Sequence, residues 1–331
     1  MAELPVREVQ PTAAAAFLLR CARNPDRWFY PVNAKARGPV ACTFRLCVAE
    51  NAPVVEMNIL ECPYSDGGTG WRVWPCALML TCWLATHASE LFLQDLSVLE
   101  VGCGLGLPGL ACAALGAASV DITDCLPRLL RCVSTSIAAS HLEHRCRASL
   151  LDWDKEAPPE DVGAQPNEEF STEQGVKAAQ LAEARSAASQ HGAGPGGPCS
   201  TQSIPSLATS TRYGLIVASD VIYSFMHASQ LPLVISRRLA PRGRLCMILP
   251  VRDRGHATTF LRGLADRGLR VLLDRVDPDW TARVIALQAP TWKASVAALA
   301  AQPRKPEPFG ESATLSEGDV LFVQATLPAE P

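Results

Sequence analysis

The chain has 331 residues, of which 48% are hydrophobic, with a net charge of -3 and a pI near 6.1. This balance is typical of a soluble globular protein and argues against a protein that grips nucleic acid through bulk positive charge. The length allows one large domain or two small ones, and the apolar stretches are too short or too rich in glycine to span a bilayer.

The N-terminal region predicts an amphipathic helix over residues 12–23, although its Ala and Arg content also fits an organelle transit peptide. Two alternating segments, 40–48 and 54–60, predict a β-hairpin ahead of the main sheet. We therefore expect an extension of helix and hairpin over residues 1–63 and a main domain over residues 64–331.

A flexible loop over residues 65–70 precedes Trp74 and Pro75, where a helix that runs to about Ala88 is expected to begin. A short buried strand is predicted next, over residues 98–101. Four glycines then occur within eight residues and predict a tight turn into a second helix: Gly102, Gly104, Gly106 and Gly109.

Two kinds of ligand site use such a turn, and this sequence matches the patterns of both. Gly104-x-Gly106-x-x-Gly109 satisfies the dinucleotide fingerprint, and Glu100-x-Gly102-x-Gly104 begins the pattern of S-adenosylmethionine (AdoMet) sites. Gly102 follows the strand directly, which favours AdoMet, because Glu100 at the strand tip then has a methionine ammonium or a ribose to bind. The alternative is a strand–helix turn without a ligand.

A second strand over residues 119–124 ends in Asp124, about 20 residues after Gly104, which is the spacing of a carboxylate that reaches a nucleotide ribose. The alternative role for Asp124 is to cap the helix that begins near Pro127. Both roles are compatible with one another.

The rest of the chain alternates further strands and helices, with a compositional break over residues 155–211. Pro, Gly, Ser, Ala, Gln and Glu dominate that stretch, which predicts a low-complexity insertion that is disordered or loosely helical, with a helix expected over residues 172–190. The alternation predicts an α/β, Rossmann-like parallel sheet with helices on both faces and an antiparallel last strand. The expected strands are 146–151, 213–220, 243–250 and 319–327, and the expected helices are 110–116, 126–140, 229–239 and 256–267.

Thirteen cysteines are scattered singly and form no C-x-x-C pair, which favours a reducing compartment, either cytoplasm or nucleus. His141, His144 and Cys146 are the one hint of a metal cluster, but their position at a helix end favours a solvated surface, and no metal is expected.

With these residues in view, the chain resembles the seven-β-strand protein methyltransferases of family 16, which include many non-histone protein-lysine methyltransferases. The Asp-x-x-Tyr sequence after the fourth strand, together with two tryptophans, narrows the resemblance to this family. The matching segments occur in the family's order: Val73-Trp-Pro75, Val98-Leu-Glu-Val-Gly-Cys-Gly-Leu-Gly106, Ile122-Thr-Asp124, Leu151-Asp-Trp153 and Ala218-Ser-Asp-Val-Ile-Tyr223.

The resemblance implies a cofactor site with named residues. Gly102, Cys103 and Gly104 would line the methionine part of AdoMet, and Asp124 would bind its ribose hydroxyls. Trp153 would lie against the adenine. The family commonly has alanine where this chain has Cys103, but both side chains are small.

Two further residues complete the implied cofactor pocket, and two belong to the acceptor side. Trp74 would close the pocket from the N-terminal side, and Ser219, where the family commonly has alanine, would contact the cofactor. Asp220 and Tyr223 would face the incoming nucleophile. The alternatives are a helix cap for Asp220 and core positions for Tyr223 and the two tryptophans.

The resemblance implies an AdoMet-dependent enzyme that methylates a lysine side chain of a protein. The composition and the short apolar stretches predict no nucleic-acid or membrane partner, and we expect a monomer. Residue chemistry agrees, since Asp220 can attract an ammonium and Tyr223 can orient an amine or pass its proton to solvent. The alternatives are transfer to arginine, histidine or a small molecule, and a non-catalytic AdoMet-binding interaction subunit. An NAD-dependent dehydrogenase has only the glycines in its favour.

Overall fold

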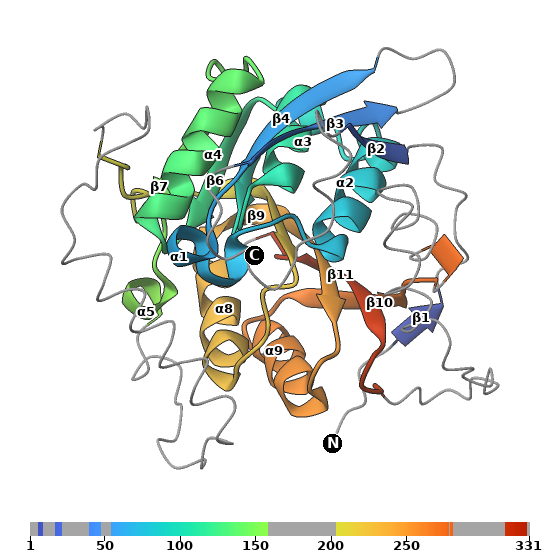
Figure 1. Cartoon of the computed structure of the whole chain (residues 1–331). Helices are drawn as coiled ribbons and strands as arrows, with labels where there is room; N and C mark the ends of the chain where they lie inside the picture. The colour runs from blue at the N-terminus through green and yellow to red at the C-terminus, as the bar shows by residue number, and fades with distance from the viewer. Residues whose placement is uncertain are drawn as a thin grey trace.

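The computed structural model describes residues 6–8, 17–21, 40–47, 54–157, 203–277, 279–280 and 315–329. Its centre is an eight-stranded sheet with the order β1-β10-β11-β9-β8-β5-β6-β7 (Figure 1). Its strands are β1 Val6–Glu8, β5 Ser97–Glu100, β6 Ser119–Asp124, β7 Cys146–Leu150, β8 Tyr213–Ser219, β9 Leu239–Pro250, β10 Arg270–Arg275 and β11 Val320–Thr326. The helices are α1 Tyr64–Gly67, α2 Pro75–His87, α3 Leu107–Ala114, α4 Pro127–Ala139, α5 Trp153–Glu156, α8 Phe225–Arg238 and α9 Arg254–Asp266.

The order of the strands confirms the predicted fold class. The pairs from β7 to β9 are parallel, and β11 runs antiparallel to both β9 and β10. The chain fills the sheet outward from β5, first through β6 and β7 and then, on the other side, through β8 and β9. An α/β sheet binds its ligand where this order reverses, here between β5 and β8. The parallel strand β1 at the edge is an eighth strand that the sequence did not predict.

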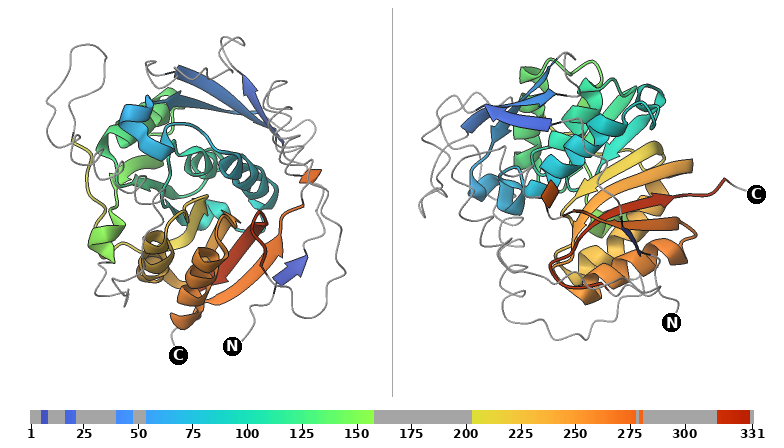
Figure 2. Two further views of the ribbon diagram at one scale, coloured as in Figure 1. Left: turned by 60° about the horizontal axis from the view of Figure 1, so that its bottom comes forward. Right: turned by 90° about the vertical axis from the view of Figure 1, so that its right-hand side faces the viewer.

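Helices cover both faces of the sheet, as Figures 1 and 2 show: α2, α3 and α4 lie on one face and α8 and α9 on the other. Alternate residues of β8 supply the two cores, since Leu215 and Val217 pack on the first face and Ile216 and Ala218 on the second. A parallel strand that is buried on both faces needs such a continuous apolar run. The two apolar layers hold the strand ends in fixed positions.

The N-terminal region forms a second, three-stranded sheet from β2 Phe17–Cys21, β3 Val40–Cys47 and β4 Val55–Glu61. The antiparallel hairpin of β3 and β4 is as predicted. The helix expected over residues 12–23 is wrong over Phe17–Cys21, because this segment pairs with β3 as a strand. A local helical pattern is outweighed here by pairing with a strand distant in sequence.

Two serines, Ser136 in α4 and Ser140 directly after it, hold the free edge of β4. The Ser136 hydroxyl accepts from the Leu60 amide at 2.9 Å, and the Ser140 hydroxyl accepts from the Asn58 amide at 2.9 Å. Phe44 and Met57 of the small sheet are buried in the same apolar cluster as the first face of the main sheet. The division of the chain at residue 63 stays a prediction.

Two helices, α8 and α9, begin earlier than predicted, and a side chain caps each of them. α8 begins at Phe225 rather than near Ser229, since the Ser224 hydroxyl accepts from the His227 amide at 3.2 Å. At the start of α9 the Asp253 carboxylate accepts from the His256 amide at 2.8 Å.

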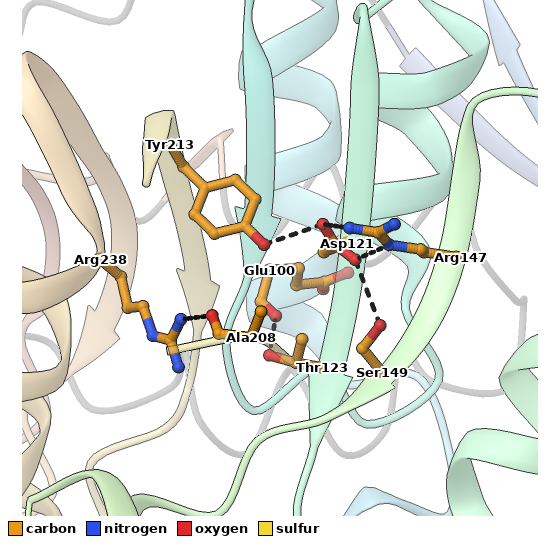
Figure 3. A network of polar contacts seen from close by, with 8 residues as sticks. All are labelled: Glu100, Asp121, Thr123, Arg147, Ser149, Ala208, Tyr213 and Arg238. Carbon is orange, nitrogen blue, oxygen red and sulfur yellow. Dashed lines mark hydrogen bonds and ion pairs between the residues drawn. The ribbon is translucent and has the colours of Figure 1, made fainter. Parts of the chain in front are cut away.

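The two ends of the predicted insertion are ordered and lie together. Before it, α5 extends to Glu156, and after it Ser206 pairs with Leu150 at the edge of β7. Arg238, which is fully buried, pairs with the Glu156 carboxylate and donates to the Ala208 carbonyl (Figure 3). The insertion predicted over 155–211 stays a prediction. The helix expected over 172–190 and the apolar segment 282–288 lie outside them.

Within the ranges that the structure describes, no helix combines the length and the apolar character needed to cross a membrane.

Candidate active site

The glycine turn lies at the carboxyl end of β5, where the strand order reverses. Gly102, Gly104 and Gly106 have φ values of 59°, 53° and 75°, which favour glycine. A Cβ on Gly102 would lie 2.8 Å from Val221 and 3.3 Å from the Trp153 indole. The turn therefore needs glycine for its backbone conformation and, at Gly102, also for the close approach of its neighbours.

Glu100 supports this turn from within the core. Its side chain is buried, with the residue 1% exposed, and its carboxylate accepts from the Gly109 amide in the first turn of α3 at 2.9 Å. Burial raises the pKa of this carboxyl to about 8. The carboxylate of Glu100 thus already has a partner in the helix, and its predicted contact with AdoMet stays a prediction.

Asp124 lies beside the turn at the carboxyl end of β6. Its two oxygens accept from the amides of Gly104, at 3.3 Å, and Leu126, at 3.2 Å. Burial raises its pKa, and these two amides oppose that effect. The cap residue of α4 is Leu126, so the alternative that Asp124 caps this helix is wrong. The Cys125 amide and thiol also donate to this carboxylate.

The Cys103 backbone joins β5 to β6, since its amide donates to the Thr123 carbonyl at 2.9 Å. Its thiol lies 3.2 Å from the Gly104 carbonyl, and burial raises its pKa well above the ordinary value. The thiol is neutral at physiological pH, so Cys103 acts as a small side chain in the turn rather than as a nucleophile.

A short loop covers the glycine turn, and Trp74 holds that loop. A Cβ on Gly70 would lie 3.0 Å from the Gly104 Cα atom, so the two backbones are in contact. The Trp74 indole N–H donates to the Thr69 carbonyl at 2.7 Å, and the Arg72 guanidinium lies 4.2 Å from the Trp74 ring centroid. Trp74 is thus joined to the segment that closes the turn on its N-terminal side.

Trp153 and Tyr223 are connected through a histidine. The His227 ring packs edge-on against Tyr223, at 4.3 Å between centroids, and edge-on against Trp153, at 5.5 Å. Tyr223 is 42% exposed, so the alternative that it is a core aromatic is wrong. The three rings run from the carboxyl end of β7 to that of β8, which brings both tryptophan and tyrosine to one side of the site.

Asp220 follows Ser219 at the end of β8 and adopts a left-handed conformation with φ 57°. Its carboxylate receives two hydrogen bonds from Arg252, at 3.0 and 2.5 Å. The cap residue of α8 is Ser224, so the helix-cap alternative for Asp220 is wrong. A non-glycine residue in this conformation is strained and is often found at functional sites.

Buried polar contacts fix the strands that carry these residues (Figure 3). Asp121 of β6 accepts from the Tyr213 hydroxyl of β8 at 2.8 Å, from Ser149 at 3.2 Å and from the Arg147 guanidinium. The Thr123 hydroxyl donates to the Glu100 carbonyl at 2.6 Å. These bonds connect β5, β6, β7 and β8 to one another.

Sequence reasoning missed Arg252 and His227. Both belong to segments that follow a strand's carboxyl end, and that position is the signal that was available. Arg252 binds Asp220, which lies 32 residues away in the sequence. His227 packs against Trp153 of α5 and against Tyr223 in the loop before α8. Among the described residues, no group of three or more His, Cys, Asp or Glu is placed to hold a metal ion.

The residues fit AdoMet on this geometry. A glycine turn that a Cβ would obstruct, a carboxylate at the end of the neighbouring strand and an indole against the turn all meet at one edge of the sheet. Gly102, Gly104, Asp124 and Trp153 are the residues that would hold it.

Comparison with known proteins points to the same chemistry. The family model described as lysine methyltransferase matches residues 55–168. The protein-lysine methyltransferase METTL21E of Mus musculus is 37% identical over 87 residues, which is 25% of this chain and 35% of that protein. The histone-arginine methyltransferase METTL23 of Homo sapiens is 35% identical over 27% of this chain and 50% of that protein. The protein N-terminal and lysine N-methyltransferase EFM7 of Yarrowia lipolytica is 26% identical over 54% of this chain and 56% of that protein. The chain thus spans little more than half of these relatives at most.

Proposed function

We propose that the protein is an AdoMet-dependent methyltransferase that acts on a lysine side chain of a protein, which the match of residues 55–168 to the lysine methyltransferase family model supports. The observation that carries this proposal is the meeting of two groups of residues at one end of the sheet. The glycine turn and Asp124 lie together at the ends of β5 and β6, and Asp220 and Tyr223 follow the end of the neighbouring strand β8.

AdoMet, when bound, supplies a methyl group on a positively charged sulfur. The chain's own task is to align an amine with it, and alignment alone accounts for a large part of such a rate enhancement. Gly102 and Gly104 would receive the methionine part and Asp124 the ribose. Trp74 would close the pocket, Trp153 would lie against the adenine and Ser219 would contact the cofactor.

A lysine side chain has an ordinary pKa of about 10.4, so it arrives protonated and must lose a proton before it attacks. The Asp220 carboxylate attracts the ammonium, and the Tyr223 hydroxyl orients the amine or passes its proton to solvent. Tyr223 is suited to the second role because it is 42% exposed.

Arginine is the second candidate acceptor, and one observation favours it: the human and Xenopus relatives named METTL23 are histone-arginine methyltransferases. The cytoplasm or nucleus as location, a monomeric state and the lack of nucleic-acid and membrane partners belong to the same proposal. Ten cysteines in the described part of the chain are free thiols, which supports a reducing compartment.

The test is incubation of the purified protein with tritiated AdoMet and a soluble cell extract, beside the variant Asp220→Ala. We expect one or a few labelled proteins that are absent with the variant. Acid hydrolysis of a labelled band then identifies methyllysine or methylarginine. Labelling of small molecules alone, or of nothing while AdoMet still binds, would contradict a protein methyltransferase.

A further inference from the structure

Arg252 lies in the loop between β9 and α9, outside the Asp-x-x-Tyr sequence, yet it makes the closest polar contacts of Asp220. Its Nε and Nη2 atoms donate to the two carboxylate oxygens at 3.0 and 2.5 Å. A planar guanidinium that donates two parallel bonds fixes the plane of a carboxylate as well as its position.

The backbones of both partners are held by the same strand. The Asp220 amide donates to the Ile248 carbonyl of β9 at 3.0 Å, and the Arg252 amide donates to the Pro250 carbonyl at 3.0 Å. The left-handed φ of Asp220 turns the chain out of β8 at this point. The ion pair therefore has a defined geometry that does not depend on a flexible loop alone.

The surroundings of Asp220 disfavour its charged form. Its side chain is only 10% exposed, and burial raises its pKa, whereas the Arg252 hydrogen bonds and charge oppose that rise. In the described part of the chain the other titratable group with an electrostatic effect on this pair is Cys76 of α2, whose own pKa burial raises, so that it stays neutral. Arg252 is thus the charge that favours the ionised form of Asp220.

The pair leaves room for a second cation. An ionised carboxylate has about four lone-pair positions, and Arg252 takes one on each oxygen. The Arg252 side chain is 54% exposed and the Asp220 side chain is 10% exposed. An ammonium can bind the remaining lone pairs without displacing the guanidinium.

We propose that Arg252 is a positioning residue for methyl transfer, which holds the Asp220 carboxylate ionised and in one orientation toward the substrate's lysine. This inference rests on the proposed function. It assigns to Arg252 an effect on the acceptor side and none on AdoMet binding.

The experiment compares initial rates of protein labelling from tritiated AdoMet in a soluble extract, from about pH 6 to about pH 9, for Arg252→Gln, Arg252→Lys and the wild type. Without its partner the Asp220 carboxyl has a higher pKa, so it is protonated at higher pH. We therefore expect Arg252→Gln to lose at least about tenfold in rate near neutral pH and to shift the acidic limb of its profile to higher pH. Arg252→Lys keeps the positive charge but cannot donate two parallel hydrogen bonds, so its rate should lie between those of Arg252→Gln and the wild type.

Arg254→Gln is the matched control, because Arg254 is also exposed, lies two residues away and has no ion pair among the described residues. It should keep the wild-type profile. In Arg252→Ala, added guanidinium ion should restore part of the rate, whereas sodium chloride at the same ionic strength should not. Calorimetric titration should give unchanged AdoMet affinity for every variant.

Two results would overturn the role of Arg252. One is a wild-type rate and profile in Arg252→Gln, and the other is a loss of rate with an unshifted profile and no rescue by guanidinium, which would indicate a merely structural arginine. A wild-type protein that labels no protein in the extract would instead refute the proposed function, and the role of Arg252 would fall with it.

Discussion

The two halves of the site differ in how their polar groups are satisfied. At the ends of β5 and β6, Glu100 and Asp124 accept hydrogen bonds from backbone amides close to them in the fold; Glu100 is buried and Asp124 is half-buried. At the end of β8, Asp220 depends on the side chain of Arg252, and Tyr223 is 42% exposed. In the first half, which we propose binds the cofactor, backbone amides already hold the carboxylates in place. In the second half, which we propose binds the substrate, Tyr223 is exposed to solvent. This is the arrangement expected when one small cofactor and one large substrate meet.

Removal of Asp220 should have the largest effect on catalysis. We expect Asp220→Ala to lower the rate of protein labelling at least about 100-fold, because the acceptor amine loses the group that attracts and aligns it. Asp220→Asn, which keeps the shape without the charge, serves as the control for folding. Rates near the wild type in both variants would show that the acceptor half is misassigned.

A methyl group on Gly102 should disable the cofactor half of the site. In Gly102→Ala the new Cβ would lie 2.8 Å from Val221, and the left-handed backbone adds about 1–2 kcal/mol of strain, so AdoMet affinity should fall at least about tenfold. The control is Gly116→Ala, which has a φ of 99° but no atom within 4 Å of the added Cβ. It should lose stability through strain and keep AdoMet affinity. Equal affinities in the two variants would contradict the need for a close approach at Gly102.

The buried Glu100 should make stability depend on pH. Its folded pKa of about 8 lies above the unfolded value of about 4.3, so its contribution is fully present below pH 4.3 and is lost as pH rises through 8. Across this window the loss should approach about 1.4 kcal/mol per pH unit. Glu100→Gln keeps the acceptor for the Gly109 amide, so its melting temperature should fall less steeply with pH. Parallel curves for the two proteins would show that Glu100 is not the responsible group.

Tyr223→Phe should have the smallest effect of the four. The ring keeps its edge-on contact with His227, and only the hydroxyl is lost, so we expect a reduction of roughly threefold to tenfold in labelling rate. A loss as large as that of Asp220→Ala would mean that the hydroxyl takes the proton in the reaction itself. Rates measured with the same extract and tritiated AdoMet distinguish these cases.

The two halves of the site also differ in how much of each could be predicted from the sequence. The strand, the glycine turn and Asp124 form a local pattern over residues 97–124, and the fold class follows from the alternation of strands and helices. Arg252 has its partner 32 residues away on another strand end, and no local pattern indicates that pairing. The strand at Phe17–Cys21 was missed for the same reason, because its pairing with β3 decides its conformation.

Glu100 shows a second limit of sequence reasoning. An acid at the tip of a strand suggests a ligand above the turn, but the same acid can accept from the first turn of the following helix. The Gly109 amide lies 2.9 Å from the carboxylate, and a Cβ on Gly109 would lie 2.5 Å from it. The close packing of α3 on β5, rather than the motif, therefore determines where this carboxylate points.

The most direct test of the division into two halves is calorimetric titration of AdoMet into the wild type, Asp124→Ala and Asp220→Ala. The account predicts binding to the wild type, at least about tenfold weaker binding to Asp124→Ala, and affinity within about threefold of the wild type for Asp220→Ala. An absence of binding to the wild type would contradict the AdoMet site. An equal loss of affinity in both variants would contradict the separation of the cofactor half from the acceptor half.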